Sequence, residues 1–218
     1  MLQELTRFGL KPNHKVLDVG CGNGKVAVRL TRFLKDGGSY EGFDVVATGV
    51  NWCKEHITPQ HPNFRFQHAD VYNKTYNPQG KYQSCEYRFP YDDGTFDFVL
   101  LGSVFTHMLP KEVEHYFGEI ARVLKRQGIC YISYYLLNPT SRKGIDAGWS
   151  FFPFPFTYGS ETCRIGNTER PEDVVAYDEG YVKGLYEKHG LRIEEPIIHG
   201  KWWWGVPHDQ DLVKATKA

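Results

Sequence analysis

The stretch KVLDVGCGNGK, residues 15–25, constrains the fold more than any other part of the chain. A short apolar run carries Asp18 near its end and is followed by glycines at alternate positions, Gly20, Gly22 and Gly24. Such a run predicts a buried strand, and glycine adopts positive φ and lets the backbone approach a ligand closely. Because ligands bind beyond the carboxyl ends of the strands in an open α/β sheet, we expect a first strand that leads into a ligand-binding loop.

Apolar runs alternate with segments of helical periodicity over most of the chain, which is typical of βα units around a largely parallel sheet. The expected strands are 15–19, 39–46, 63–71, 96–102, 128–137, 191–200 and 210–217. The expected helices are 26–34, 52–57, 110–127 and 181–189. We therefore predict an α/β fold with a seven-stranded sheet and helices on both faces.

Residues 138–176 interrupt this alternation and contain the aromatic run WSFFPFPFTYG. A segment of that length within a compact domain is usually a lid or a binding insertion. Pro153 and Pro155 predict a stiff extended segment there without regular sheet pairing. We expect one domain over 1–218, with 138–176 as a lid or acceptor-binding insertion after the fifth strand.

Composition narrows the class of ligand. The chain of 218 residues has 26 basic and 26 acidic side chains, so no net charge attracts it to nucleic acid or to an anionic membrane. No apolar run is long enough to span a bilayer, and Glu4 and Arg7 stand where a signal peptide would be apolar. The five scattered cysteines, without a C-x-x-C pair, indicate reduced thiols. These features predict a cytoplasmic protein with a small-molecule substrate.

Three ligands compete for the glycine loop. A nucleoside triphosphate loop needs a hydroxyl residue after Lys25, but Val26 stands there, and the dinucleotide fingerprint needs glycine in place of Lys25. Asp18 is poorly placed beside a pyrophosphate but well placed to accept hydrogen bonds from an ammonium group or its water shell. S-adenosylmethionine carries an ammonium and a sulfonium and no phosphate, so these residues favour it.

The sequence resembles the class I S-adenosylmethionine-dependent methyltransferases, strongly over residues 14–137 and loosely beyond. The resemblance rests on VLDVGCGNG, EGFDVV, QHAD, FDFVLLGSVFTHM and EIARVLKRQGICYIS in this order. It implies a Rossmann-like sheet, a glycine loop at the methionine part of the cofactor, Asp44 on the ribose hydroxyls and Asp70 on the adenine amine. The cofactor-binding residues predicted in this way are Asp18, Gly20, Cys21, Gly22, Asn23, Gly24, Asp44, Val45, Asp70, Val71, Gly102 and Ser103.

Candidate catalytic and acceptor-binding residues follow from position alone. His107 lies just beyond the fourth strand, whose end should face the transferred methyl group, and is the first candidate for a general base. His199 is a second candidate. The aromatic insertion is the expected acceptor pocket, with Trp149, Phe152, Phe154, Tyr158 and Trp202 as substrate-binding residues. The same aromatic side chains are also compatible with a cap over a sheet edge or a homodimer contact.

The histidines outside these positions form no closed ligand set, so we expect no metal site. The leading interpretation is a methyltransferase that acts on a small molecule, most simply at oxygen, with nitrogen and carbon open. One alternative is a non-catalytic module that binds S-adenosylmethionine and uses its aromatic surface as a protein interface. A nicotinamide-dependent oxidoreductase would need a pyrophosphate site in the glycine loop.

Overall fold

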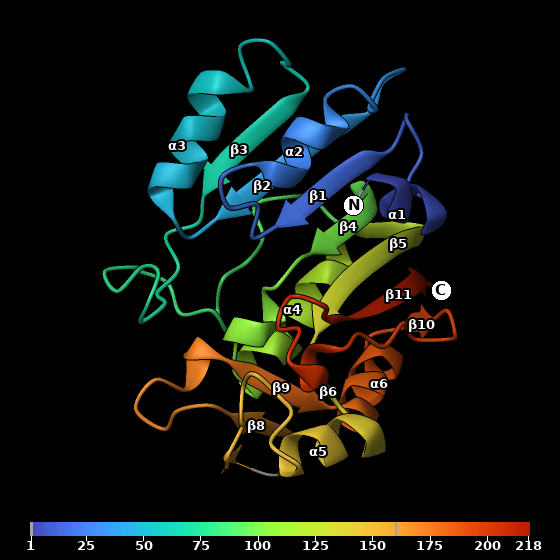
Figure 1. Cartoon of the computed structure of the whole chain (residues 1–218). Coiled ribbons are helices and arrows are strands. Elements are labelled where there is room, and N and C mark those ends of the chain that lie inside the picture. Colours follow the sequence, from blue (N-terminus) through green and yellow to red (C-terminus); the bar gives the residue numbers. More distant parts are fainter. Residues whose placement is uncertain (1, 160) are drawn as a thin grey trace.

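A seven-stranded sheet forms the centre of the computed structural model, which describes residues 2–159 and 161–218 (Figure 1). The strand order is β10-β11-β5-β4-β1-β2-β3. The strands are β1 (Lys15–Val19), β2 (Ser39–Asp44), β3 (Phe64–His68), β4 (Phe96–Leu101), β5 (Leu124–Tyr134), β10 (Leu191–Ile193) and β11 (Asp211–Lys217). Only β11 runs against its neighbours, so the predicted seven-stranded, mostly parallel α/β sheet is confirmed.

Helices cover both faces of this sheet. One face packs against α1 (Leu2–Arg7), α2 (Lys25–Leu30) and α3 (Ala47–His56), and the other against α4 (Pro110–Val123) and α6 (Glu179–Lys188). The central strands β1 and β4 are buried almost throughout because both faces are covered. The order reverses between β1 and β4, with β2 and β3 on one side and β5 on the other, which is where such sheets bind ligands.

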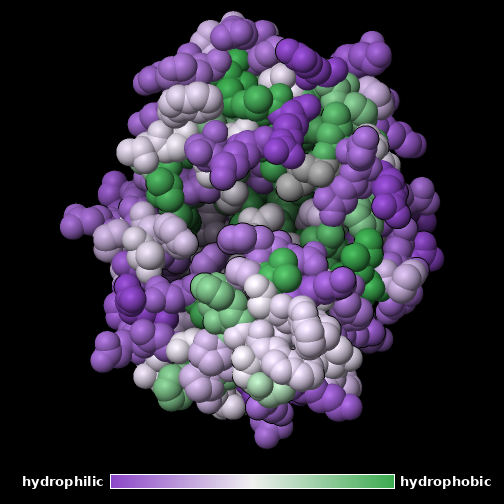
Figure 2. Space-filling view, in the orientation of Figure 1, coloured by the Kyte–Doolittle hydropathy of each residue, from purple (hydrophilic) through white to green (hydrophobic). Residues whose placement is uncertain are grey.

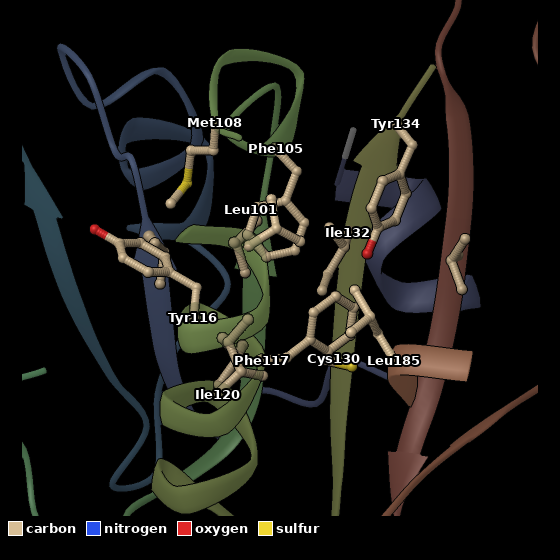
Figure 3. Packing of buried hydrophobic residues seen from close by; sticks show 14 of the residues in the cluster. Leu101, Phe105, Met108, Tyr116, Phe117, Ile120, Cys130, Ile132, Tyr134 and Leu185 are labelled. Carbon is tan, nitrogen blue, oxygen red and sulfur yellow. The ribbon is translucent and has the colours of Figure 1, made fainter. Parts of the chain in front are cut away.

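The helix α4 shows why its sequence pattern predicted a buried face. Its residues Phe117 and Ile120 belong to the same buried cluster as Leu101 of β4 and Ile132 of β5, and Figure 3 shows Phe117 between the helix and β5. The expected helix extends to residue 127, but the structure ends it at Val123 and begins β5 at Leu124. Pairing of Leu124 with Phe96 in the sheet accounts for this early end, since tertiary pairing overrides local helical preference.

The strand expected over 128–137 divides after Tyr134. Leu136 donates its N–H to the Asp211 carboxylate at 2.7 Å and pairs with Tyr177 in a second sheet. That sheet has the order β6-β9-β8-β7 and consists of β6 (Leu136–Leu137), β7 (Phe156–Tyr158), β8 (Cys163–Ile165) and β9 (Val175–Asp178). The expected strand 191–200 is likewise short, and beyond Ile193 only a single bridge joins Ile198 to Leu212.

No strand includes Pro153 or Pro155, as expected, but the residues that follow them form β7 of the second sheet. Both prolines precede β7, which lies at the edge of the sheet, so their missing N–H groups remove no hydrogen bond from the ladder. The helix α5 (Pro139–Asp146) follows β6, and Asn138 caps it by accepting the N–H groups of Thr140 and Ser141. The described part of 138–176 thus contains α5, β7, β8, a short 3-10 helix at Pro171–Asp173 and the start of β9.

An aromatic cluster joins the second sheet to the C-terminal segment. Trp202, in the short helix η3 (Trp202–Trp204), is fully buried and packs on Tyr135 and Phe154 with ring centroids 5.1 and 5.6 Å apart. Its indole N–H donates to the buried Asp211 carboxylate at 2.6 Å, while Asp211 also accepts the N–H of Gly200. One carboxylate therefore fixes the positions of three segments.

Replacing Trp202 by Phe should lower the free energy of unfolding by about 1–3 kcal/mol, because it removes the donor to a buried carboxylate and leaves part of the indole volume empty. Trp204→Phe is the matched control, since Trp204 is 54% exposed, and should change stability by less than about 0.5 kcal/mol. Urea unfolding of both variants measures the difference. Equal effects would contradict this role of Trp202.

Candidate functional site

The glycine loop after β1 has the backbone that its sequence predicts. Gly20, Gly22 and Gly24 have φ of 80, 53 and 75°. A Cβ on Gly20 would lie 2.4 Å from Cγ2 of Val104, and one on Gly24 would lie 2.7 Å from Sγ of Cys53. Neither position accepts a side chain without displacing its neighbour, so the loop presents bare backbone at this edge of the sheet.

A cavity of about 550 Å³ lies at the carboxyl ends of β1, β2 and β4, in the size range of small-molecule sites. In the space-filling view the surface is hollowed near the middle of this face (Figure 2). Both Gly20 and Gly22 of the glycine loop and His107 line this cavity. The predicted cofactor residues that line it are Gly20, Gly22, Asp44, Val45, Val71, Gly102 and Ser103.

Asp44 connects the glycine loop to the end of β2. Its Oδ2 accepts the N–H of Gly22 at 2.7 Å and its Oδ1 accepts the N–H of Val46 at 2.8 Å. A carboxylate oxygen has further lone pairs, so both oxygens can still accept hydroxyl donors from a ligand. The site therefore combines bare backbone with one acidic acceptor, which fits an adenosine cofactor; contact of Asp44 with the ribose stays a prediction.

The prediction for Asp18 has to be corrected, because the side chain of Asp18 does not line the cavity. Its side chain is buried and accepts the hydroxyl of Tyr40 at 2.5 Å. Burial raises the pKa of Asp18 to about 7, although the Tyr40 hydrogen bond opposes this shift. The Asp18 side chain is thus buried against Tyr40 of β2 and does not line the cavity, so the expectation that it meets the ammonium group of the ligand does not fit this geometry.

Four further predicted residues also lie outside the wall. Cys21 is buried against Gly42, Asn23 is exposed, and Gly24 packs on α3. The carboxylate of Asp70 faces Lys81 at 3.5 Å, while its neighbour Val71 lines the cavity.

His107 stands in the short helix η1 (Phe105–His107) and lines the cavity as predicted. Its Nδ1 lies 3.1 Å from the carbonyl oxygen of Glu172, and since a carbonyl only accepts, this contact places a proton on Nδ1. Nε2 of the neutral ring is then an acceptor. The ring of Tyr76 meets the imidazole edge-on, with centroids 5.7 Å apart.

The sequence patterns missed several cavity residues. Tyr72, Asn73 and Tyr76 come from the irregular segment after β3, where Thr75 donates to Asp173 and Lys74 to the Glu169 carbonyl. No periodic signal marks these residues. The other missed wall residues are Val19, Lys25, Phe43, Val46, Ser84, Val104, Met108 and Tyr116.

Tyr116 could have been found, since it continues the buried face of α4. In Figure 3 its hydroxyl points away from the packed side chains of β4 and β5, with Met108 nearby. The residue is 4% exposed and borders the cavity, and burial raises the pKa of its phenol well above the ordinary value. It is therefore a neutral polar group at the cavity.

The aromatic side chains predicted to form the acceptor pocket do not line the cavity beside the glycine loop. The side chains concerned are absent from the cavity wall: Trp149, Phe152, Phe154, Tyr158 and Trp202. Phe154 and Trp202 are buried in the aromatic cluster, and Trp149 packs on Trp204 with centroids 4.6 Å apart. Phe152, Phe154 and Trp202 pack on Tyr135, which uses their apolar surface, whereas Trp149 and Tyr158 are exposed.

His199, which was predicted as a second catalytic candidate, also lies outside the cavity wall. Its Nδ1 lies 3.4 Å from Asp211 and its Nε2 lies 3.7 Å from Glu179, and it does not line the cavity. Burial raises the pKa of Asp211, which His199 opposes. The histidine is therefore part of the structural contacts around β11.

The described residues contain neither a candidate metal-binding group nor a candidate membrane-spanning helix. Within 2–159 and 161–218, His, Cys, Asp and Glu side chains form no group of three or more suited to a metal ion. No helix in those ranges combines the length and apolarity needed to cross a bilayer.

Residues 17–132, slightly more than half of the chain, match a family model described as "Methyltransferase domain". Sterol 24-C-methyltransferase erg6 of Schizosaccharomyces pombe is 29% identical over 123 residues, which are 56% of this chain and 28% of that protein. For 27-O-demethylrifamycin SV methyltransferase of Amycolatopsis mediterranei, identity is 28% over 138 residues, with coverage of 63% and 44%. The chain thus spans less than half the length of these two curated relatives.

A solved structure of Burkholderia thailandensis 1,6-didemethyltoxoflavin-N1-methyltransferase, with 1,6-didemethyltoxoflavin and S-adenosylhomocysteine bound, is similar in fold. Its TM-score is 0.61 at 16% identity, over 95% of this chain and 72% of that one. The chain belongs to the methyltransferase-domain family. This membership confirms the class I resemblance and S-adenosylmethionine as the cofactor.

Gly20→Ala should weaken S-adenosylhomocysteine binding at least about tenfold, since the new Cβ must displace Val104 from the cavity wall. Gly37→Ala is the control: Gly37 also has positive φ, 89°, but a Cβ added there would have no atom within 4 Å. It should lower stability without changing affinity. Isothermal titration calorimetry checks both, and similar losses of affinity would contradict the role of the contact.

Asp18→Asn should remove a pH dependence of stability. A carboxyl whose pKa is raised in the folded state binds more protons when folded, so its contribution to the free energy of unfolding falls as pH rises from about 4 to about 7, by at most about 4 kcal/mol. Asparagine keeps an acceptor for Tyr40 without the buried charge. Denaturant unfolding at pH 5 and pH 8 should show a smaller difference for the variant; an unchanged difference would refute this.

Proposed function

We propose that the chain transfers a methyl group from S-adenosylmethionine to a small-molecule acceptor, at oxygen, by in-line displacement. A single observation supports this proposal most strongly: one cavity contains both the glycine loop with Asp44 and the acceptor nitrogen of His107. A cofactor held at one end then leaves room for a second molecule at the other. The proposal includes a cytoplasmic location and no nucleic-acid partner.

The bound cofactor supplies an activated methyl group on a sulfonium, which leaves as the neutral thioether. The protein has to orient the acceptor, exclude water and take a proton. Orientation alone contributes about 7–11 kcal/mol in favourable cases. Tyr76, Met108 and Tyr116 line the same cavity as His107 and give it a largely apolar wall with two phenol groups. Nε2 of His107 accepts the proton of an acceptor hydroxyl as the oxygen–carbon bond forms.

The choice of oxygen rests on His107, because a hydroxyl acceptor must lose a proton during transfer. The relatives do not decide the atom, since their names specify methylation at carbon, at oxygen and at nitrogen. Nitrogen and carbon acceptors are therefore the outcomes that an acceptor screen has to separate from oxygen. A nicotinamide-dependent reaction is disfavoured by the family match.

His107→Ala should lower turnover by about 10²- to 10⁴-fold while S-adenosylhomocysteine affinity stays within about twofold of the parent. The assay follows label from methyl-labelled S-adenosylmethionine into a fractionated small-molecule extract. His199→Ala is the matched control, since His199 lies outside the cavity, and should retain turnover. Equal turnover in parent and His107→Ala would remove His107 from the mechanism.

A non-catalytic module is the second candidate, because one surface region is aromatic and exposed. Trp149, Phe151 and Trp204 are 50, 64 and 54% exposed, which suits a protein interface. Retention of the cofactor without label transfer in any fraction, together with a stable partner lost on Trp204→Ala, would favour this candidate over the enzyme.

A further inference from the structure

The loop after β4 contains an unusual backbone conformation at the cavity. Ser103 has φ of 58°, a left-handed conformation that costs a residue with a Cβ free energy and persists only where its surroundings hold it. Gly102, Ser103 and Val104 all line the cavity. The loop therefore requires an interaction that compensates this strain.

Two side chains from elsewhere supply that interaction. Oγ of Ser133, in β5, accepts the N–H of Ser103 at 2.8 Å and donates to Oε1 of Gln210 at 2.6 Å. The same Gln210 oxygen accepts the hydroxyl of Ser103 at 3.1 Å. Both the backbone and the side chain of Ser103 are thus held by Ser133 and Gln210, which are hydrogen-bonded to each other.

The pair is itself held firmly. Ser133 is buried and lies opposite Leu212 in the register between β5 and β11. Gln210 immediately precedes Asp211, whose carboxylate binds the N–H groups of Leu136, Gly200 and Trp202. Because these contacts hold Asp211 in the aromatic cluster around Trp202, they also restrict the position of the neighbouring Gln210.

The position of Ser103 matters for the cofactor because the next residue, Val104, lies against the glycine loop. Val104 approaches Gly20 so closely that a Cβ there would lie 2.4 Å from Cγ2 of Val104. A change of φ at Ser103 would move Val104 relative to the glycine loop, and both line the same cavity. We propose that Ser133 and Gln210 are positioning residues, which hold the loop after β4 in the conformation that binds S-adenosylmethionine.

Ser133→Ala tests the proposal without any knowledge of the acceptor. It leaves the N–H of Ser103 without its acceptor, so affinity for S-adenosylhomocysteine, measured by calorimetry, should fall about tenfold. Adding Ser103→Gly should recover most of this loss, since glycine adopts positive φ without strain. A merely structural role of Ser133 would not give this recovery.

Ser141→Ala is the matched control. Ser141 is also a buried serine whose Oγ accepts a backbone N–H, from Asn138, and donates to backbone carbonyls, of Leu136 at 2.7 Å and Asn138 at 3.2 Å, but it lies in α5 and does not line the cavity. It should lower the thermal midpoint without a change in affinity. If Ser141→Ala weakens binding as much as Ser133→Ala, or if Ser133→Ala binds like the parent, the proposal is overturned.

A second pair of variants applies if Ser133→Ala does not fold. Gln210→Ala removes the shared acceptor and should weaken S-adenosylhomocysteine binding, whereas Gln210→Glu keeps an oxygen for both hydroxyls and should bind more tightly than Gln210→Ala. Equal affinity of the two variants would overturn the role of Gln210. Methyl transfer need not occur for either result, so a failure here is distinct from a failure of the proposed enzymatic activity.

Discussion

The close approach of bare backbone in the glycine loop to its neighbours is the constraint on which the site depends. Gly20 leaves space for Val104 of the next loop, and Gly24 leaves space for Cys53 of α3. The Gly22 N–H binds Asp44, which connects the loop to the end of β2. Parallel strands bring these loops to one edge of the sheet, and the cavity exists because no side chain fills the space between them.

The C-terminal third of the chain acts on this cavity indirectly. Its aromatic side chains are used for packing around the buried Asp211 carboxylate, and they do not reach the cavity wall. The contact that does reach it is polar: Gln210 meets Ser103 and Ser133 beside the loop after β4. A methyltransferase domain thus combines a rigid apolar support with a small number of hydrogen bonds at the site.

The part of the cavity wall around Tyr76 and His107 is built from segments with little regular structure. Tyr76 comes from a loop that is tethered to η2 (Pro171–Asp173), and η2 follows Glu169 and precedes β9. His107 takes its ring orientation from the Glu172 carbonyl of the same region. The segment 138–176 therefore influences the candidate base through its backbone, although its predicted role as a lid or acceptor-binding insertion stays a prediction.

Local patterns were sufficient for the sheet, the glycine loop, Asp44 and His107, because each is marked by strand periodicity or by a motif at a strand end. Tyr116 also carried a signal, since it continues the apolar face of α4. Tyr76 carried none, because it reaches the cavity through contacts with residues far along the chain. Aromatic content alone predicted a pocket after Trp149 and did not show which surface the rings would cover.

The sequence by itself determined the order of the βα units and the backbone freedom of the loop after β1, because both follow from local periodicity and from glycine. Only the tertiary structure decided that Asp18 is buried against Tyr40, that His199 contacts Asp211, and that Trp202 is buried. These outcomes depend on which distant segments pack together. Long-range packing and the burial of one carboxylate settle them, and neither is visible in a local pattern.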